Sequence, residues 1–82
     1  MARYFFDTRD NGTLIVDDEG VELPDLEAVK VQAATSLAEL ALDVLPGSIQ
    51  RNLTVHVRDM ADNLVMVTQL TFEAQIFIEL AG

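Results

Sequence analysis

Residues 52–80, NLTVHVRDMADNLVMVTQLTFEAQIFIEL, contain the pattern that decides the fold. In the first part, Leu53, Val55 and Val57 alternate with polar residues, which is the period of a strand with one buried face. After the loop MADN the alternation resumes over residues 64–80, about three times the usual strand length. The pattern predicts an antiparallel hairpin. It leaves two alternatives for its second strand: a bend after Phe72, or an end that leaves the monomer to pair with another chain.

The N-terminal residues 3–18, RYFFDTRDNGTLIVDD, predict a second hairpin. The aromatic residues near the start favour a strand. Asn11 and Gly12 are the pair that a tight hairpin turn prefers, because both positions need a positive φ. Leu14 begins the return strand, and Asp17 and Asp18 end it.

Between the two hairpins the sequence predicts a helix over about residues 25–45. Pro24 cannot extend a strand ladder, and Asp25 can accept a hydrogen bond from the free N–H groups of a first helical turn. Apolar residues then recur at intervals of three and four positions. Pro46 and Gly47 end the helix.

These elements predict an α+β fold with the order β-β-α-β-β in a single domain of residues 1–82. One helix packed on one face of a four-stranded antiparallel sheet buries both apolar sets. Counting strands along the chain, we expect the order 2-1-3-4. In that order the crossover through the helix can be right-handed and all neighbouring strands run antiparallel.

The chain has 14 acidic and 5 basic residues, a formal charge of −9. This charge opposes direct binding to nucleic acid, and the five cations form no basic stripe. There is no cysteine, so disulfides and thiolate metal sites are absent. The N-terminus lacks the features of a signal peptide, and no apolar run is long enough to span a membrane. We expect a cytoplasmic protein.

No residue pattern predicts catalysis, a cofactor or a metal site. His56 is the single histidine and lies on the polar side of an expected strand, without a nucleophile or orienting carboxylate nearby in the pattern. The most acidic stretch is DDEGVELPDLEA, residues 17–28. Most of its charges fit a strand end or a helix start. Asp18, Glu19 and Glu22 remain as a candidate surface for a basic protein.

The apolar content is high for so short a chain, since half of the residues are hydrophobic. A domain of this size often needs a partner subunit to bury enough apolar surface. We therefore expect a homo-oligomer. The residues expected to form its interface lie in a second apolar row of the helix and at the C-terminal end of the chain: Val31, Leu42, Ile76, Phe77, Ile78 and Leu80.

The segments RYFFDTRDNG, DDEGVELPDLEAV and LTFE together resemble a family of short proteins from rhizobia and related alphaproteobacteria. The resemblance covers essentially the whole chain and implies a domain of unknown function, so it supplies no catalytic residues. The chain departs from the family pattern at the apolar end IFIELA and at Val31. Both departures favour an added interface.

A looser similarity to HicB-type antitoxins rests on the acidic PDL segment that leads into a helix. Two hypotheses follow. The first is a non-catalytic protein-interaction module that self-associates through the long last strand and the helix face. The alternative is an acidic, antitoxin-like or inhibitory partner of a basic, RNA-directed protein. An enzyme is not expected.

Overall fold

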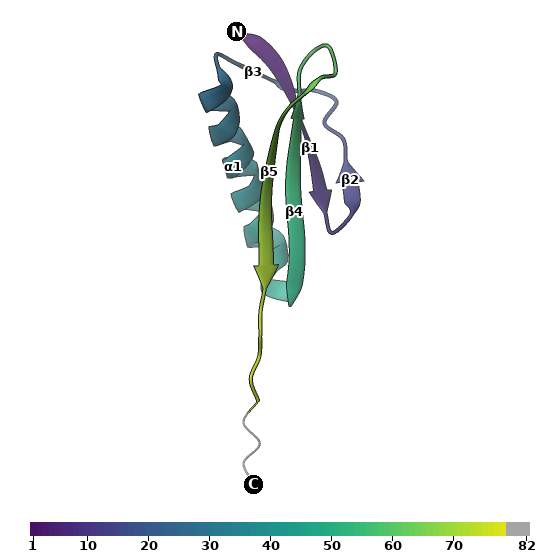
Figure 1. Ribbon diagram of the computed structural model, residues 1–82, viewed down its shortest axis with the longest axis vertical. Helices are drawn as coiled ribbons and strands as arrows, with labels where there is room; N and C mark the ends of the chain where they lie inside the picture. Colours follow the sequence, from purple (N-terminus) through teal and green to yellow (C-terminus); the bar gives the residue numbers. More distant parts are fainter. Residues whose placement is uncertain (79–82) are drawn as a thin grey trace.

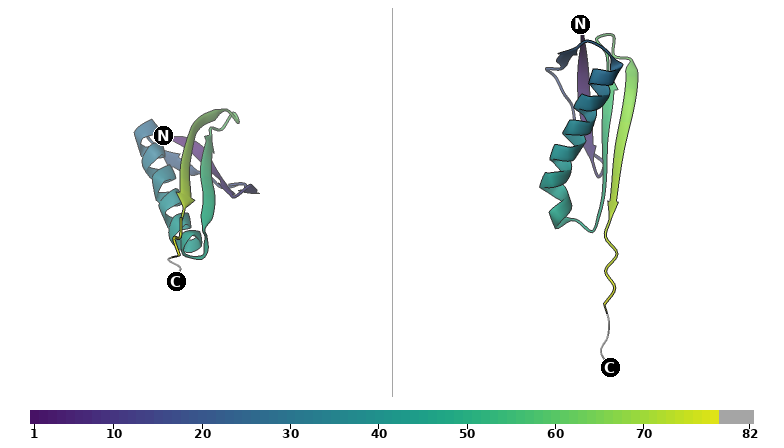
Figure 2. Two further views of the ribbon diagram at one scale, coloured as in Figure 1. Left: turned by 60° about the horizontal axis from the view of Figure 1, so that its bottom comes forward. Right: turned by 90° about the vertical axis from the view of Figure 1, so that its left-hand side faces the viewer.

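The structure is a computed structural model that describes residues 1–78. Its sheet contains five antiparallel strands: β1 (Ala2–Asp10), β2 (Thr13–Ile15), β3 (Val21–Leu23), β4 (Gln50–Arg58) and β5 (Leu64–Glu73). Four of them lie in the order β2-β1-β4-β5, and β3 also pairs with β1. One helix, α1 (Leu26–Val44), covers one face of the sheet, and the short 3₁₀ turn η1 (Leu45–Gly47) leads into β4 (Figures 1 and 2).

The expected α+β class, with one helix and an antiparallel sheet, is confirmed. The sheet differs from the prediction in strand number and in the detail of its order. The additional strand, β3, lies in the acidic stretch and pairs with the start of β1, with Tyr4 opposite Val21 and Ala2 opposite Leu23. Since β2 pairs with the other end of β1, two short strands share one edge of the same long strand.

The two ends of the helix follow the sequence signals. The Asp25 side chain accepts a hydrogen bond from the Ala28 N–H at 2.8 Å, as expected of an N-cap. After Val44 the chain tightens into η1, which contains Pro46 near its start. Asn11 and Gly12 both have positive φ, so the first hairpin also turns as its sequence predicts.

The core lies between α1 and the two central strands. On the helix side, Val29, Ala33 and Leu37 are buried. On the sheet side, Leu53, Val55 and Val57 of β4 are fully buried and Phe6 of β1 lies beside them. Helix residues at a spacing of four thus meet strand residues at a spacing of two, which is the packing that the two sequence periods predict. No helix of residues 1–78 covers the other face of the sheet (Figure 2).

The inward face of β5 changes parity near its start. Val57 pairs with Met66 and Arg58 with Leu64, so a bulge between these pairs leaves Val65 without a direct partner. Leu64 is exposed although its alternation places it with the inward set, and Val65 packs against the core instead. Beyond the bulge, Met66, Leu70 and other even-numbered residues face α1.

Candidate interaction surface

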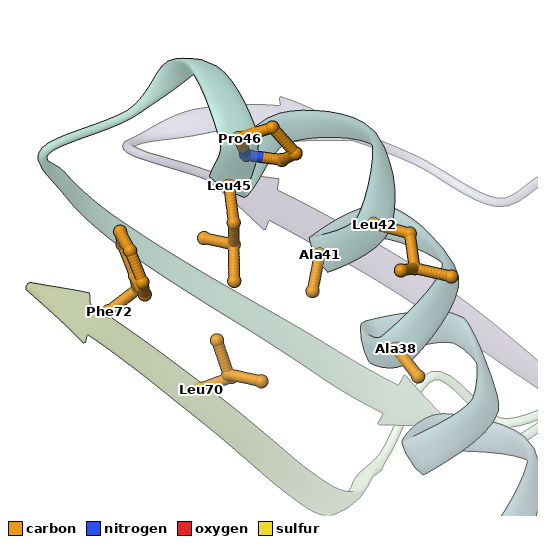
Figure 3. Close-up of a pocket in the computed structure, with 7 residues that line it drawn as sticks. All are labelled: Ala38, Ala41, Leu42, Leu45, Pro46, Leu70 and Phe72. Atoms are coloured by element: carbon orange, nitrogen blue, oxygen red, sulfur yellow. The ribbon is translucent and has the colours of Figure 1, made fainter.

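An apolar groove lies between the C-terminal half of α1 and β5. Its volume is about 640 Å³, and every side chain that lines it is apolar (Figure 3). The helix and η1 supply one wall and β5 supplies the other. The lining residues are Ala38, Ala41, Leu42, Leu45, Pro46, Leu70 and Phe72.

The groove follows from small residues on the helix and a short turn after it. Ala38 and Ala41 extend only a methyl group toward β5 (Figure 3). Leu42 lies at the rim, where its side chain is 80% exposed. A well-packed monomer would fill such a space with larger side chains, because interiors pack almost without voids. The open apolar groove is therefore an unpartnered surface.

β5 is an edge strand, and it ends where β4 can no longer pair with it. Gln50, the first residue of β4, pairs with Glu73, and the last bond runs from the Ala74 N–H to the Ile49 carbonyl at 2.7 Å. The strand expected over residues 64–80 is thus too long: β5 stops at Glu73. The sequence left open whether the chain bends after Phe72 or leaves the monomer. In the structure the chain continues away from the sheet in an extended path (Figure 1).

Residues 74–78, hereafter the C-terminal segment, are mostly apolar, and all of them except Ala74 are exposed. Ile76, Phe77 and Ile78 are 71%, 88% and 79% exposed. The segment leaves the sheet at the end of β5 that borders the groove, since Phe72 lines the groove and Ala74 follows two positions later. An exposed apolar patch of this kind beside an open strand edge is typical of a protein contact.

The structure brings together part of the set expected for self-association. Leu42 borders the groove, and Ile76, Phe77 and Ile78 lie in the C-terminal segment. Val31 is exposed on α1 three turns before Leu42, outside the groove lining. Leu80 lies outside the described residues.

Sequence reasoning missed most of the groove lining. Ala38 belongs to the second apolar row of the helix and Pro46 to its predicted end, and neither was among the residues expected at an interface; the structure places both in the groove wall. Leu70, Phe72, Ile76 and Ile78 share one parity of the alternating run over residues 64–80. That shared parity was the available signal that strand and C-terminal segment present the same face.

The acidic stretch has a structural centre at Asp17. Its carboxylate accepts hydrogen bonds from the N–H groups of Phe6 (3.0 Å), Glu19 (3.1 Å) and Gly20 (3.1 Å). Burial opposes ionisation of this carboxyl, but the three N–H groups outweigh it and lower the pKa of Asp17 below its ordinary value of 3.8. Asp17 thus fills the gap between β2 and β3 along the edge of β1.

The three acidic residues expected to contact a partner lie around this centre and are exposed. Arg3 donates a hydrogen bond to the Glu19 carbonyl at 2.7 Å, and its guanidinium lies 3.6 Å from the Glu22 carboxylate. Glu22 is therefore partly compensated. Asp18 and Glu19 have no ion pair within residues 1–78. This acidic loop lies along β1, whereas the apolar groove lies between α1 and β5, the strand at the other edge of the sheet.

Two arginines of the sheet form close ion pairs with carboxylates of β1. Arg58 pairs with Asp7 at 2.7 Å, donates to the Asp17 carbonyl at 2.8 Å and lies 4.7 Å from the centre of the Phe5 ring. Its hydrogen bonds lower the pKa of the Asp7 carboxyl. Arg51 pairs with both carboxylate oxygens of Asp10, at 2.6 and 2.8 Å. These carboxylates are held ionised, which suits structural ion pairs better than acid–base catalysis.

Within residues 1–78, no three His, Asp or Glu side chains are close enough together to hold a metal ion. Over the same residues, no helix has the length and hydropathy needed to span a membrane. His56 lies on the uncovered face of the sheet, half-buried and opposite Asp7.

No curated protein and no solved structure matches the chain significantly. A family of domains of unknown function, DUF6894, matches residues 3–71. The matched span includes the sheet up to most of β5 and the whole of α1, but not the C-terminal segment. The match confirms the expected domain of unknown function, while the organism group and the HicB likeness stay predictions. The chain belongs to the DUF6894 family.

Proposed function

We propose that this protein is a non-catalytic interaction module that self-associates through its C-terminal segment and the exposed apolar face of α1. The observation that carries the proposal is the coincidence of three unpartnered features at one end of the molecule: the apolar groove, the open edge of β5 and the exposed C-terminal segment.

The free energy of burying the apolar side chains of the C-terminal segment is comparable with the cost of association. Full burial of one side chain such as Ile76 or Ile78 contributes about 1.5–3 kcal/mol. In a symmetric dimer each side chain is buried twice, so the C-terminal segments of two copies can offset the roughly 4–15 kcal/mol that association costs. Leaving the same side chains in water beside an open strand edge would instead favour aggregation.

Sedimentation velocity at micromolar concentration tests the proposal directly. We expect a mass of twice the 9.0 kDa chain. The variant Ile76→Asp/Ile78→Asp should sediment as a monomer with an unchanged far-ultraviolet circular dichroism spectrum, because both side chains lie outside the core. A wild-type protein that sediments at 9.0 kDa over this concentration range would contradict the proposal.

The matched control adds the same two charges elsewhere. Val16 and Met60 are exposed apolar residues in loops at 58% and 69% exposure, away from the groove. The variant Val16→Asp/Met60→Asp should remain dimeric. Loss of the dimer in this control would mean that added negative charge, rather than the C-terminal contact, separates the copies.

A second candidate function is an acidic, antitoxin-like or inhibitory partner of a basic protein. It is supported by the exposed carboxylates of Asp18 and Glu19 on a loop that Asp17 holds in a defined shape. A pull-down at low and at high salt tests it. A specific basic partner should be retained at low salt, released at high salt and lost with the neutral variant Asp18→Asn/Glu19→Gln/Glu22→Gln. Equal retention by that variant would argue against the candidate.

A further inference from the structure

We infer that the occupant of the groove is the C-terminal segment of a second copy, which pairs antiparallel with β5 across a two-fold axis at Ala74. The inference rests on the proposed self-association and adds its geometry: Ile76 and Ile78 of each copy enter the α1–β5 groove of the other.

The free hydrogen-bonding groups of β5 are the first support. The Ala74 N–H donates to Ile49, so Ala74 points its backbone groups toward β4. Backbone groups alternate in direction along an antiparallel strand. Thr71, Glu73 and Gln75 consequently point theirs to the open edge, where a second strand can bind them.

The direction of the side chains is the second support. Leu70 and Phe72 face the groove, and the same parity continues to Ile76 and Ile78. A two-fold axis perpendicular to the sheet keeps the helix-covered faces of both copies on one side. The isoleucines of one copy then face α1 of the other. A slip of one residue would turn them to the polar face.

The third support is the register. Pairing that sets Ile76 against Phe72 and Ile78 against Leu70 also sets Ala74 against Ala74. A small side chain therefore lies at the axis, where two identical side chains meet. In this register Glu73 faces Gln75, whose amide already reaches the Glu73 carboxylate at 3.2 Å within one chain. An axis at Glu73 would place two carboxylates opposite each other, which is destabilising.

The segment cannot fill the groove of its own chain without reversing direction directly after β5. Residues 74–78, AQIFI, contain no glycine, proline, asparagine, aspartate or serine, the residues that turns prefer. Their alternation is that of a strand, and they extend away from the sheet (Figure 1). A second copy is the occupant that uses the segment as a strand.

Single-cysteine variants test the geometry cleanly, because the chain has no cysteine of its own. Residues directly opposite in a non-hydrogen-bonded antiparallel pair have Cα atoms about 4.5 Å apart, within the roughly 4.4–6.8 Å that a disulfide spans. Under mild oxidation, Ala74→Cys should double its mass on a denaturing, non-reducing gel. Thr71→Cys on the same edge should stay at the monomer mass, since its two copies lie about 20 Å apart in this register.

A mixture of two different cysteine variants tests the same register in case the Ala74→Cys substitution itself disturbs the contact. Glu73→Cys and Gln75→Cys, mixed in equal amounts, should form the heterodisulfide faster than either variant forms a homodisulfide. Two results would overturn the geometry but leave self-association intact, provided that the wild type still sediments as a dimer. The first is efficient cross-linking of Thr71→Cys. The second is the absence of cross-linking both in Ala74→Cys and in the mixed pair. A monomeric wild type would overturn both.

Discussion

Replacing Asp17 by alanine removes the acceptor of three backbone hydrogen bonds. The carboxylate receives the Phe6 N–H on one oxygen and the Glu19 and Gly20 N–H groups on the other. The Phe6 N–H belongs to β1 at the gap between β2 and β3, so it has no strand to replace the lost acceptor. We expect Asp17→Ala to loosen the β2–β3 connection and destabilise the fold.

The size of the effect follows from the setting of each bond. A hydrogen bond to a charged acceptor contributes about 1.5–3 kcal/mol when it is shielded, and much less when water can replace it. The bonds from Phe6 and Gly20 are part-buried and the bond from Glu19 is exposed. The total loss in the free energy of unfolding should be about 2–4 kcal/mol. Asp17→Asn keeps one accepting oxygen and should lose about 1–2 kcal/mol.

Urea denaturation followed by circular dichroism measures this loss. With a slope of about 1 kcal/mol/M for a small domain, the Asp17→Ala midpoint should fall by about 2–4 M. All variants must be compared at one protein concentration, because the proposed dimer would add to the apparent stability.

The matched control is Asp18→Ala, which removes an adjacent exposed carboxylate that makes no ion pair within residues 1–78. Its free energy of unfolding should change by less than about 0.5 kcal/mol. If Asp17→Ala and Asp18→Ala shift the midpoint equally, the hydrogen bonds to Asp17 do not hold this edge of the sheet.

Two further predictions concern the same edge of the sheet. Gly20 has a φ of 74°, and an added Cβ would lie 2.9 Å from the Tyr4 carbonyl oxygen, so Gly20→Ala should lower the free energy of unfolding by about 1–3 kcal/mol. Gly12 has a φ of 95°, but an added Cβ would meet no atom within 4 Å, so Gly12→Ala should lower it less. Equal urea midpoints for the two variants would refute the steric argument. The pKa of Asp7 is lowered by its hydrogen bonds to Arg58, so the unfolded state binds more protons in acid. The stability that this pair contributes should be fully present above pH 3.8, the ordinary pKa, and should fall as the pH drops toward the lowered pKa. The thermal midpoint of Asp7→Asn should therefore depend less steeply on acid pH than that of the wild type. An unchanged slope would exclude the Asp7–Arg58 pair as the source of the pH dependence.

The sequence predicted the elements that depend on local residue patterns and missed the features that depend on how distant segments are placed relative to one another. The buried face of β4 and the caps of α1 were readable because periodicity and N-cap chemistry are local. Strand β3 was not, since Val21–Leu23 is only three residues long, lies in a charged stretch and is held by pairing with β1. The end of β5 was misplaced because it depends on where β4 begins.

The candidate site divides in the same way. The apolar residues Ile76, Phe77 and Ile78 stood out from the sequence as too hydrophobic to remain unpaired in water. The groove beside them did not, because it depends on how closely α1 approaches β5. Ala38 and Ala41 look like ordinary helix-forming residues until the opposite strand is in place.

The occupied edge of β1 bears on how many copies the proposed assembly would hold. Among residues 1–78, the sheet offers one long open edge, that of β5, because β2, Asp17 and β3 together occupy the outer side of β1. The proposed dimer, formed edge to edge through β5, would consume the surface that another copy would need, so assembly would close at two. Opening the β1 edge would give each chain two unpaired strand edges, which is the condition for growth into an open-ended fibre.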